Sequence, residues 1–349
     1  MTIRKLTRFG AMTAAVSSLV ATALVAPLPA QAKSLPTVTI GYENNGADPE
    51  MVAIAEGYFS KYMHARVDMR MFSSGPAALA ALAAGSLQFM TGIGNPPAVS
   101  AIARGVPLKV IWAQEMYTKD EGLVVRKNSG IKNLKDLKGK TVALVLGSTS
   151  PFELDTALQR SKIPIPSVRI LNMSPPSMRA AWTNGQIQAA YVWDPVFDSL
   201  VHDNGRVLMY DLNVSKQAPI FNLAVVNSKW AKTNGSLVQG FISAEAAGMQ
   251  FYHSHPAKAL ADMAKEAGIS VKLAKTELSG FRLLTPAMQL STLGLGYGKT
   301  VKSSLVTKSL TSAAKYLYQS NTMSENPSNM AQYVDPIYVH QYVRQHPKG

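Results

Sequence analysis

Short runs of β-branched and apolar residues alternate with segments of helical spacing through about the first two-thirds of the chain. The apolar runs lie at 37–40, 67–72, 108–112, 122–125, 141–144, 168–173, 189–193 and 221–226. Because strands that alternate with helices form sheets covered by helices, this pattern predicts an α/β fold. From Trp230 onward the apolar spacing is helical, and we expect this tail to pack against the first part of the chain.

One pattern occurs twice, and its two copies are one hundred positions apart. The first copy contains Ser74-Gly75-Pro76, Ala80-Ala81-Leu82 and Gly85-Ser86-Leu87-Gln88, and the second contains Ser174-Pro175-Pro176, Ala180-Ala181-Trp182 and Gly185-Gln186-Ile187-Gln188. Each copy predicts a helix between two strands, with a Ser cap, a Pro near its first turn and a Gly at its end. A β–α–β unit present twice predicts two similar lobes with a ligand-binding cleft between them.

The start of the chain is typical of a secretory signal peptide at 1–32. A basic segment, 4–8, precedes the apolar run 10–25, and Ala30-Gln31-Ala32 has the small residues of a cleavage site. The chain has no cysteine, so the sequence excludes disulfides, a thiol nucleophile and a lipid-bearing cysteine. We therefore expect a free protein in a bacterial periplasm.

The formal net charge is +14, of which three cations belong to the predicted signal peptide, so the mature chain carries +11. The cations are scattered, without the basic block that binds nucleic acid. Neither an H-E-x-x-H nor a G-x-S-x-G motif is present, and Gly294–Thr300 lacks the spacing of a phosphate loop. These observations predict a binding protein rather than an enzyme, with no cofactor and no metal.

Four predicted helices begin at the carboxyl ends of strands, where the crevice of such folds lies. Their starts are near Asp48, Ser74, Ser150 and Ser174. A helix N-terminus offers free N–H groups and a partial positive charge, so these starts favour a small anionic ligand. Ser150 also forms a capping-box pattern with Glu153, which would use its hydroxyl within the helix.

The same strand ends carry acids and aromatic residues, namely Tyr42, Glu43, Glu115, Tyr117, Trp193 and Asp194. A carboxylate beside an aromatic face suits an ammonium group. Asp194-Pro195 equally fits a helix start, with Asp as the cap and Pro in the first turn. Asp194 is therefore a candidate for either role.

The second copy of the repeat and its counterpart in the first lobe carry motifs of a known family. These motifs are Asn172-Met173-Ser174-Pro175-Pro176, Ala180-Ala181-Trp182, Ala190-Tyr191-Val192-Trp193, Phe72-Ser73-Ser74-Gly75, Ala84-Gly85-Ser86-Leu87-Gln88 and Asn95-Pro96. They resemble the taurine-binding proteins of bacterial ABC importers, within the nitrate/sulfonate/taurine class. The resemblance implies a type II periplasmic binding protein fold, with two Rossmann-like lobes and two crossover strands.

This resemblance also implies a division of the chain. We expect lobe 1 to begin at 33–125, lobe 2 to span 126–222, and 223–349 to return to lobe 1 and add the C-terminal helices. The strands at 122–125 and 221–226 are the expected crossings between the lobes.

The function implied is a monomeric solute-binding protein that closes on taurine or a related small sulfonate and delivers it to an ABC permease. A sulfonate would be held by main-chain N–H groups and hydroxyls, and the taurine amine by a carboxylate. The family carries an acid near Asn222, where this chain has an amide, so Asp194 or Glu43 would supply the charge. Alternatives are an alkanesulfonate, nitrate or other small anion, a ligand-presenting sensor, or an enzyme similar to the pyrimidine-precursor synthases.

The candidate ligand-binding residues are those at the strand ends, the helix starts and the second crossing strand. They are Tyr42, Glu43, Asn44, Ser73, Ser74, Asn95, Gln114, Glu115, Ser148, Thr149, Ser150, Trp193, Asp194 and Asn222.

Overall fold

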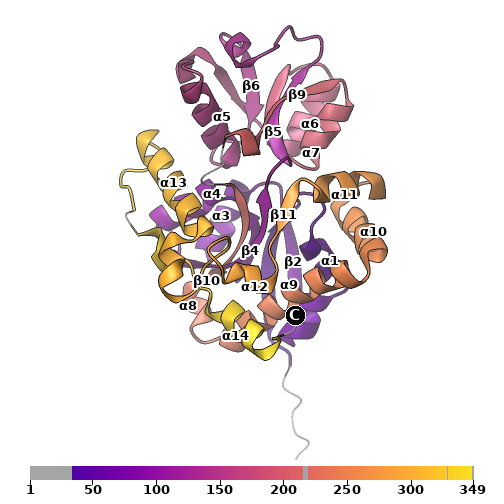
Figure 1. The fold of residues 1–349 in the computed structure, drawn as a ribbon, viewed down its shortest axis with the longest axis vertical. Coiled ribbons are helices and arrows are strands. Elements are labelled where there is room, and N and C mark those ends of the chain that lie inside the picture. The colour runs from indigo at the N-terminus through magenta and orange to yellow at the C-terminus, as the bar shows by residue number, and fades with distance from the viewer. Residues whose placement is uncertain (1–33, 215–218, 328, 348–349) are drawn as a thin grey trace, which may run out of the picture. The chain divides into compact units, whose positions relative to one another are not determined.

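Two mixed sheets organise the computed structural model, which describes residues 34–214, 219–327 and 329–347 (Figure 1). The six-stranded sheet contains, in spatial order, β11 (Phe281–Leu283), β4 (Leu108–Tyr117), β10 (Phe221–Asn227), β3 (Phe89–Ile93), β1 (Thr37–Glu43) and β2 (Arg66–Phe72). The five-stranded sheet contains β7 (Arg169–Asn172), β6 (Thr141–Leu144), β8 (Ala189–Trp193), β5 (Glu121–Arg126) and β9 (Gly205–Tyr210). We call the six-stranded sheet with its helices lobe 1 and the five-stranded sheet with its helices lobe 2. The predicted signal peptide lies outside the described residues.

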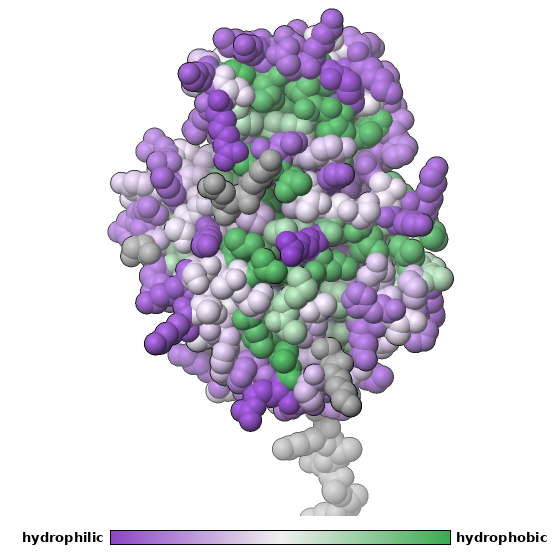
Figure 2. Space-filling model, in the orientation of Figure 1, coloured by the Kyte–Doolittle hydropathy of each residue, from purple (hydrophilic) through white to green (hydrophobic). Residues whose placement is uncertain are grey.

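Helices cover both sheets, and hydrophilic residues lie around the periphery of the face in Figure 2 while hydrophobic ones gather toward its middle. The helices are α1 (Pro49–Ala55), α2 (Tyr58–Met63), α3 (Gly75–Ala83), α4 (Asn95–Ala103), α5 (Thr149–Arg160), α6 (Pro175–Thr183), α7 (Val196–His202), α8 (Ser228–Ala231), α9 (Gly235–Ser254), α10 (Pro256–Ala267), α11 (Val271–Leu278), α12 (Pro286–Gln289), α13 (Leu305–Gln319) and α14 (Ile337–Gln345). None of those in the described part of the chain has the length and apolar character needed to cross a bilayer.

The two lobes repeat one arrangement, which confirms the predicted pair of β–α–β units. In lobe 1, β1 pairs in parallel with β2 and β3, and α3 connects those two neighbours. In lobe 2, β6 pairs in parallel with β7 and β8, which α6 connects. Gly85 and Gly185 follow these helices at the same positive φ of 71°, which glycine adopts without steric cost.

Antiparallel strands complete each sheet and show where the chain changes lobes. β10 pairs antiparallel with β3 and β4, and β5 pairs antiparallel with β8 and β9. The chain therefore enters lobe 2 between Tyr117 and Glu121, and it returns to lobe 1 between Tyr210 and Phe221. The expected crossings were the strands at 122–125 and 221–226, which are part of β5 and β10. Each observed passage between the lobes lies directly before one of these strands.

The C-terminal helices pack on lobe 1. The Phe241 ring of α9 stacks on Phe89 of β3, with ring centroids 4.5 Å apart and an interplanar angle of 7°. A Cβ atom on Gly240 would lie 2.5 Å from the main-chain oxygen of Tyr62, so α9 and α2 are in backbone contact. Burial of these aromatic faces, not local helix propensity, holds the tail on the sheet.

Local capping rules place most helix starts correctly and one wrongly. Asp48 caps α1, and its Oδ1 accepts a hydrogen bond of 3.1 Å from the N–H of Met51. The capping box predicted for Ser150 is wrong, because Ser148 caps α5 and accepts from the Ser150 N–H. The Ser150 hydroxyl instead donates to Glu121, an acid 29 positions earlier in the sequence.

Candidate functional site

The strand ends of the two lobes border one narrow pocket, which we call the interlobe pocket. Its lining residues are Glu43, Asn45, Gly75, Pro76, Gly92, Gly94, Pro97, Tyr117, Ser148, Thr149, Trp193 and Asn222. The free volume is about 20 Å³, which is room for roughly one water molecule. The lobes are therefore nearly closed on each other at this point.

Three helices begin at the interlobe pocket, namely α3 and α4 of lobe 1 and α5 of lobe 2. Prolines in the first turn of each helix remove N–H donors, which leaves those of Gly75, Asn95 and Thr149 at the helix starts. The Gly75 N–H donates to the Glu43 carboxyl, so an acid of the chain itself faces α3. The starts of α4 and α5, one from each lobe, form the side of the pocket that suits an anion.

The hydroxyls predicted to contact the ligand are engaged with the protein. The Ser148 hydroxyl donates to the Val145 carbonyl at 2.8 Å and accepts from the Ser150 N–H at 3.2 Å. The Thr149 and Ser150 hydroxyls each donate to the Glu121 carboxylate at 2.7 Å. An anion at this pocket would therefore meet mainly main-chain N–H groups rather than free hydroxyls.

Buried acids without a cationic partner lie in and behind the lining of the interlobe pocket. Glu43, Glu115 and Glu121 are at most 5% exposed. The ion pairs among the described residues involve Arg70 and Lys258 on the surface and none of these three acids. Burial raises the pKa of Glu121 to about 7. Burial, followed by repulsion from Glu121, raises the pKa of Glu43 well above its ordinary value. The site thus holds acids whose charged form lacks a cationic partner within the described residues.

Asn222 connects one of these acids to the interlobe pocket. It lies opposite Glu115 in the β10–β4 pairing. Its Nδ2 donates to Glu115 Oε1 and, at 3.1 Å, to the Tyr117 hydroxyl. Burial, followed by repulsion from Asp48, raises the pKa of Glu115 well above its ordinary value. The amide therefore satisfies one oxygen of a fully buried acid, whose Oε2 has no hydrogen-bond partner among the described residues.

The structure brings together some of the sequence candidates and separates others. Five of them line the interlobe pocket, namely Glu43, Ser148, Thr149, Trp193 and Asn222. Four others do not line the pocket but lie next to residues around it. Asn95 accepts a hydrogen bond from the Phe221 N–H, Gln114 from the Gly92 N–H and Glu115 from the Asn222 amide, and Ser150 follows Thr149 in the sequence.

The remaining candidates do not line the pocket themselves, although Ser74 adjoins its lining residue Gly75. Tyr42 packs toward α10, because neighbouring side chains of a strand point to opposite faces and Glu43 faces the pocket. Asn44 donates to the carbonyl of Ala267. Ser73 is exposed, while Ser74 is buried at the start of α3. Asp194 is 2% exposed and lies in a separate group of acids.

Sequence reasoning missed Glu121, Asn45 and Gly94. Glu121 opens the apolar strand β5, and an acid at the head of such a strand is the signal that could have identified it. Asn45 donates to the Gly92 carbonyl at 2.9 Å and so fixes the loop beside the pocket. Gly94 had no signal in the sequence, because its role depends on its closeness to Thr149 in the other lobe.

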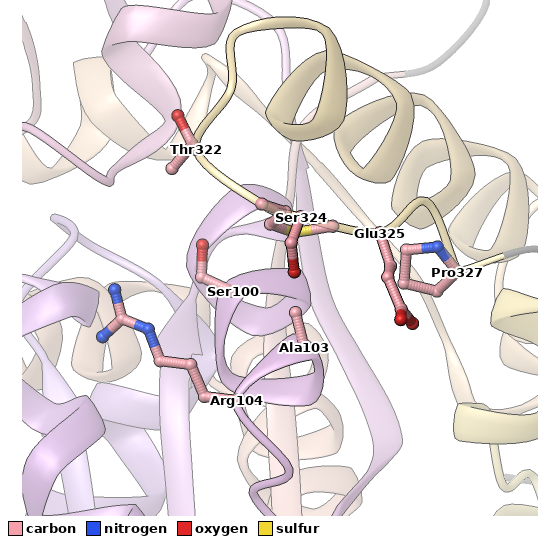
Figure 3. A pocket seen from close by; sticks show the side chains of 8 residues that line it. Ser100, Ala103, Arg104, Thr322, Ser324, Glu325 and Pro327 are labelled. Carbon is pink, nitrogen blue, oxygen red and sulfur yellow. The ribbon is translucent and has the colours of Figure 1, made fainter.

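A larger pocket of about 400 Å³ lies at the opposite end of α4 (Figure 3). Ser100 and Arg104 line it from the end of α4, and Glu325 and Pro327 line it from the segment after α13. In Figure 3, Arg104 and Glu325 point away from each other. The C-terminus of a helix carries partial negative charge, so this place suits an anion less well than the start of α4.

The raised pKa values predict that stability falls as pH rises from 5 to 8.5. Burial raises the pKa of Glu50 to about 8 and that of Glu121 to about 7, from 4.5 in both cases. The folded protein then holds protons that the unfolded chain releases above pH 4.5, so the stabilisation is full below that pH and is lost toward pH 8. A difference of one pKa unit between the folded and the unfolded protein corresponds to about 1.4 kcal/mol of stability. We therefore expect the unfolding temperature to drop by at least roughly 3 °C over this pH range.

Thermal unfolding followed by circular dichroism at constant salt measures this effect. Glu121→Gln should flatten the profile between pH 5 and 7, while the exposed Glu325→Gln should leave it unchanged. An unfolding temperature that stays level or rises with pH in the unsubstituted protein would contradict the prediction.

Comparison with known proteins gives a consistent set of similarities. A family model described as NMT1/THI5 like matches residues 44–259. The chain is 30% identical over 309 residues to the taurine-binding periplasmic protein of Escherichia coli (strain K12), covering 86% of this chain and 92% of that protein.

Two solved structures share the fold. The alkanesulfonate-binding protein of Xanthomonas axonopodis pv. citri bound to MOPS has a TM-score of 0.71 at 21% identity, covering 87% of this chain and 99% of that one. The periplasmic aliphatic sulphonate binding protein of Escherichia coli has a TM-score of 0.68 at 23% identity, covering 88% and 100%.

Proposed function

The chain belongs to the NMT1/THI5 like family, and we propose from this that it is the solute-binding protein of an ABC importer for taurine or a related small sulfonate. The similarity to a taurine-binding periplasmic protein over most of both chains supports this proposal. We propose further that the mature protein acts as a periplasmic monomer and delivers its ligand to the transmembrane subunits of a permease.

One observation carries the choice of an aminosulfonate. The interlobe pocket is lined by residues at the starts of α3, α4 and α5 and by the buried acid Glu43, which has no ion-pair partner among the described residues. A ligand with a sulfonate at one end and an ammonium at the other would place its sulfonate against N–H groups of the helix starts and its ammonium against the Glu43 carboxylate. A plain anion would leave the Glu43 carboxylate without a counter-charge.

Glu43 is the acid best placed to meet the ammonium. It lines the pocket, whereas Glu121 lies behind Thr149 and Ser150. Both Glu121 oxygens already accept hydroxyl hydrogen bonds. The Glu43 carboxyl accepts one N–H, from Gly75, and a carboxylate has further acceptor sites.

Binding requires the lobes to separate and close again, because the closed pocket has room for about one water molecule. A ligand that contacts both the α4 start in lobe 1 and the α5 start in lobe 2 would favour the closed arrangement.

Calorimetric titration of the chain from Lys33 onward with taurine and with isethionate tests the proposal. Isethionate carries a hydroxyl in place of the ammonium. We expect taurine to bind at least roughly tenfold more tightly, since a charge-assisted contact contributes more than 1.4 kcal/mol. Glu43→Gln should weaken taurine binding by about tenfold or more and leave isethionate binding nearly unchanged, while the surface control Glu325→Gln should change neither.

Two outcomes would redirect the assignment. Equal affinity for both ligands would favour an alkanesulfonate or another anion without an amine. Absence of heat with any small sulfonate would contradict the proposed function.

A further inference from the structure

A group of four acids lies outside the interlobe pocket, and we call it the carboxylate cluster: Asp120, Asp194, Asp198 and Glu277. Carboxylate oxygens of Asp194, Asp198 and Glu277 all lie within 4.8 Å of one another. Asp194 and Asp198 come from the end of β8 and from α7, and Glu277 comes from α11. Part of this cluster is already bonded to the protein, since Asp194 Oδ1 accepts from the Asp198 N–H at 2.9 Å and Glu277 Oε2 accepts from the Ala47 N–H at 3.0 Å.

A fourth carboxyl points into this group without a full set of partners. Asp120 is 1% exposed, and its carboxyl is hydrogen-bonded to that of Asp194. Its Oδ2 is buried and has no hydrogen-bond partner among the described residues. Within the same part of the chain, Asp198 Oδ2 and Glu277 Oε1 are also buried without a partner. A buried oxygen with no donor costs stability unless an ion or a proton satisfies it.

Among the described residues, no lysine or arginine forms an ion pair with the carboxylate cluster. The ion pairs within those ranges lie on the surface, at Arg70 and Lys258. His202 is the titratable base near the cluster, where it lowers the pKa of Asp198 against the stronger effect of burial. Four acids therefore face one basic side chain.

We propose that the carboxylate cluster binds a divalent metal ion of the size of calcium. All its donors are oxygens, and hard cations such as calcium and magnesium take oxygen ligands. Oxygens at about 2.3–2.6 Å from a calcium ion lie at most about 5 Å apart, and the cluster meets this limit. Magnesium, at about 2.0–2.1 Å, would require a tighter group.

Such an ion would tie the two lobes together. Asp194 and Asp198 belong to lobe 2, while Glu277 is bonded to the lobe 1 loop at Ala47. An ion that contacts both sides favours the arrangement in which they meet, and so stabilises the closed and folded protein.

Calcium binding is measured directly on the EDTA-treated mature protein at pH 7.5 and constant ionic strength. We expect one site with a Kd between about 10⁻⁶ and 10⁻⁴ M, in the range of oxygen-ligated calcium sites. The unfolding temperature should rise with calcium chloride, rise less with magnesium chloride and stay unchanged with potassium chloride. No sulfonate is present in this experiment, so its result is independent of the proposed transport function.

Two variants separate metal binding from a general effect on stability. Asp198→Asn and Glu277→Gln each remove repulsion, so both should be as stable as the parent protein or more stable in EDTA. Each should weaken calcium binding by at least tenfold, whereas Glu325→Gln, on the surface, should leave it unchanged. Absence of calcium heat together with an unchanged unfolding temperature in the parent protein would overturn the proposal, as would full calcium affinity in either variant.

Discussion

Replacing Gly94 by alanine is expected to lower the affinity for the sulfonate ligand by about a hundredfold while leaving the fold intact. A Cβ atom at Gly94 would lie 2.6 Å from Thr149 Cγ2. Gly94 precedes α4 in lobe 1 and Thr149 begins α5 in lobe 2, so the added methyl group would hold the lobes apart. The φ angle of Gly94 is −70°, which alanine adopts without strain. A hundredfold loss corresponds to about 2.7 kcal/mol, within the range of an overpacked contact.

A compensating substitution distinguishes steric separation of the lobes by the added methyl group from a loss of folding. Thr149→Ser removes Cγ2 and keeps the hydroxyl that donates to Glu121. The double variant Gly94→Ala/Thr149→Ser should regain most of the lost affinity, and Thr149→Ser alone should bind nearly as well as the parent. Calorimetry gives the affinities, and small-angle scattering with saturating ligand should show compaction in the double variant and not in Gly94→Ala. If the double variant bound the ligand as weakly as Gly94→Ala does, steric separation of the lobes would be ruled out.

The repeated lobes were predictable because their signals are local. Proline at a helix start and glycine at a helix end act through backbone geometry within a few residues. Gly85 and Gly185 accordingly adopt the same φ of 71°, one hundred positions apart. The hydrophobic period separates strands from helices in the same way.

The candidate site was only partly predictable, because its contacts join residues far apart in the sequence. Ser150 and Glu153 match a capping box, but α5 already begins at Thr149 and Ser148 is its cap. The Ser150 hydroxyl donates to Glu121, 29 positions away in the sequence, a contact that no local pattern indicates. Glu121 could have been identified only from its place as an acid at the head of the apolar strand β5.

Strand alternation decided which neighbours reach the pocket. Glu43 lines it and Tyr42 faces α10, although both end the same strand. The sequence shows that β1 ends near these two residues. It does not show which of the two side chains faces the pocket, because the second lobe forms part of that pocket. Asp194 shows a related limit: it follows Trp193, which lines the pocket, yet its carboxylate joins Asp198 and Glu277.

Replacing Asn222 by aspartate is expected to destabilise the protein by about 3 kcal/mol at pH 8. The Asn222 amide donates to Glu115 and to Tyr117, and a carboxylate has no hydrogen to donate. Both positions are buried, with Asn222 3% and Glu115 0% exposed, so the change would set two acids against each other without solvent. The resemblance to taurine-binding proteins implies an acid near this position, but this chain has an asparagine there and an acid, Glu115, on the neighbouring strand β4. The amide is therefore the partner that Glu115 requires.

Urea denaturation at pH 8 measures this loss, and Asn227→Asp is a matched control on the same strand. The Asn227 side chain accepts from the N–H groups of Lys229 and Trp230, and aspartate caps a helix equally well, so the control should be near neutral. Adding Glu115→Gln to Asn222→Asp should restore most of the stability, because it returns one donor to the pair and leaves one acid. Equal stability of Asn222→Asp and the control would show that Glu115 does not constrain this position. The expected pattern would mean that Glu115 requires an amide rather than an acid at position 222. An amine recognised by this protein would then meet Glu43 in the interlobe pocket rather than an acid at position 222.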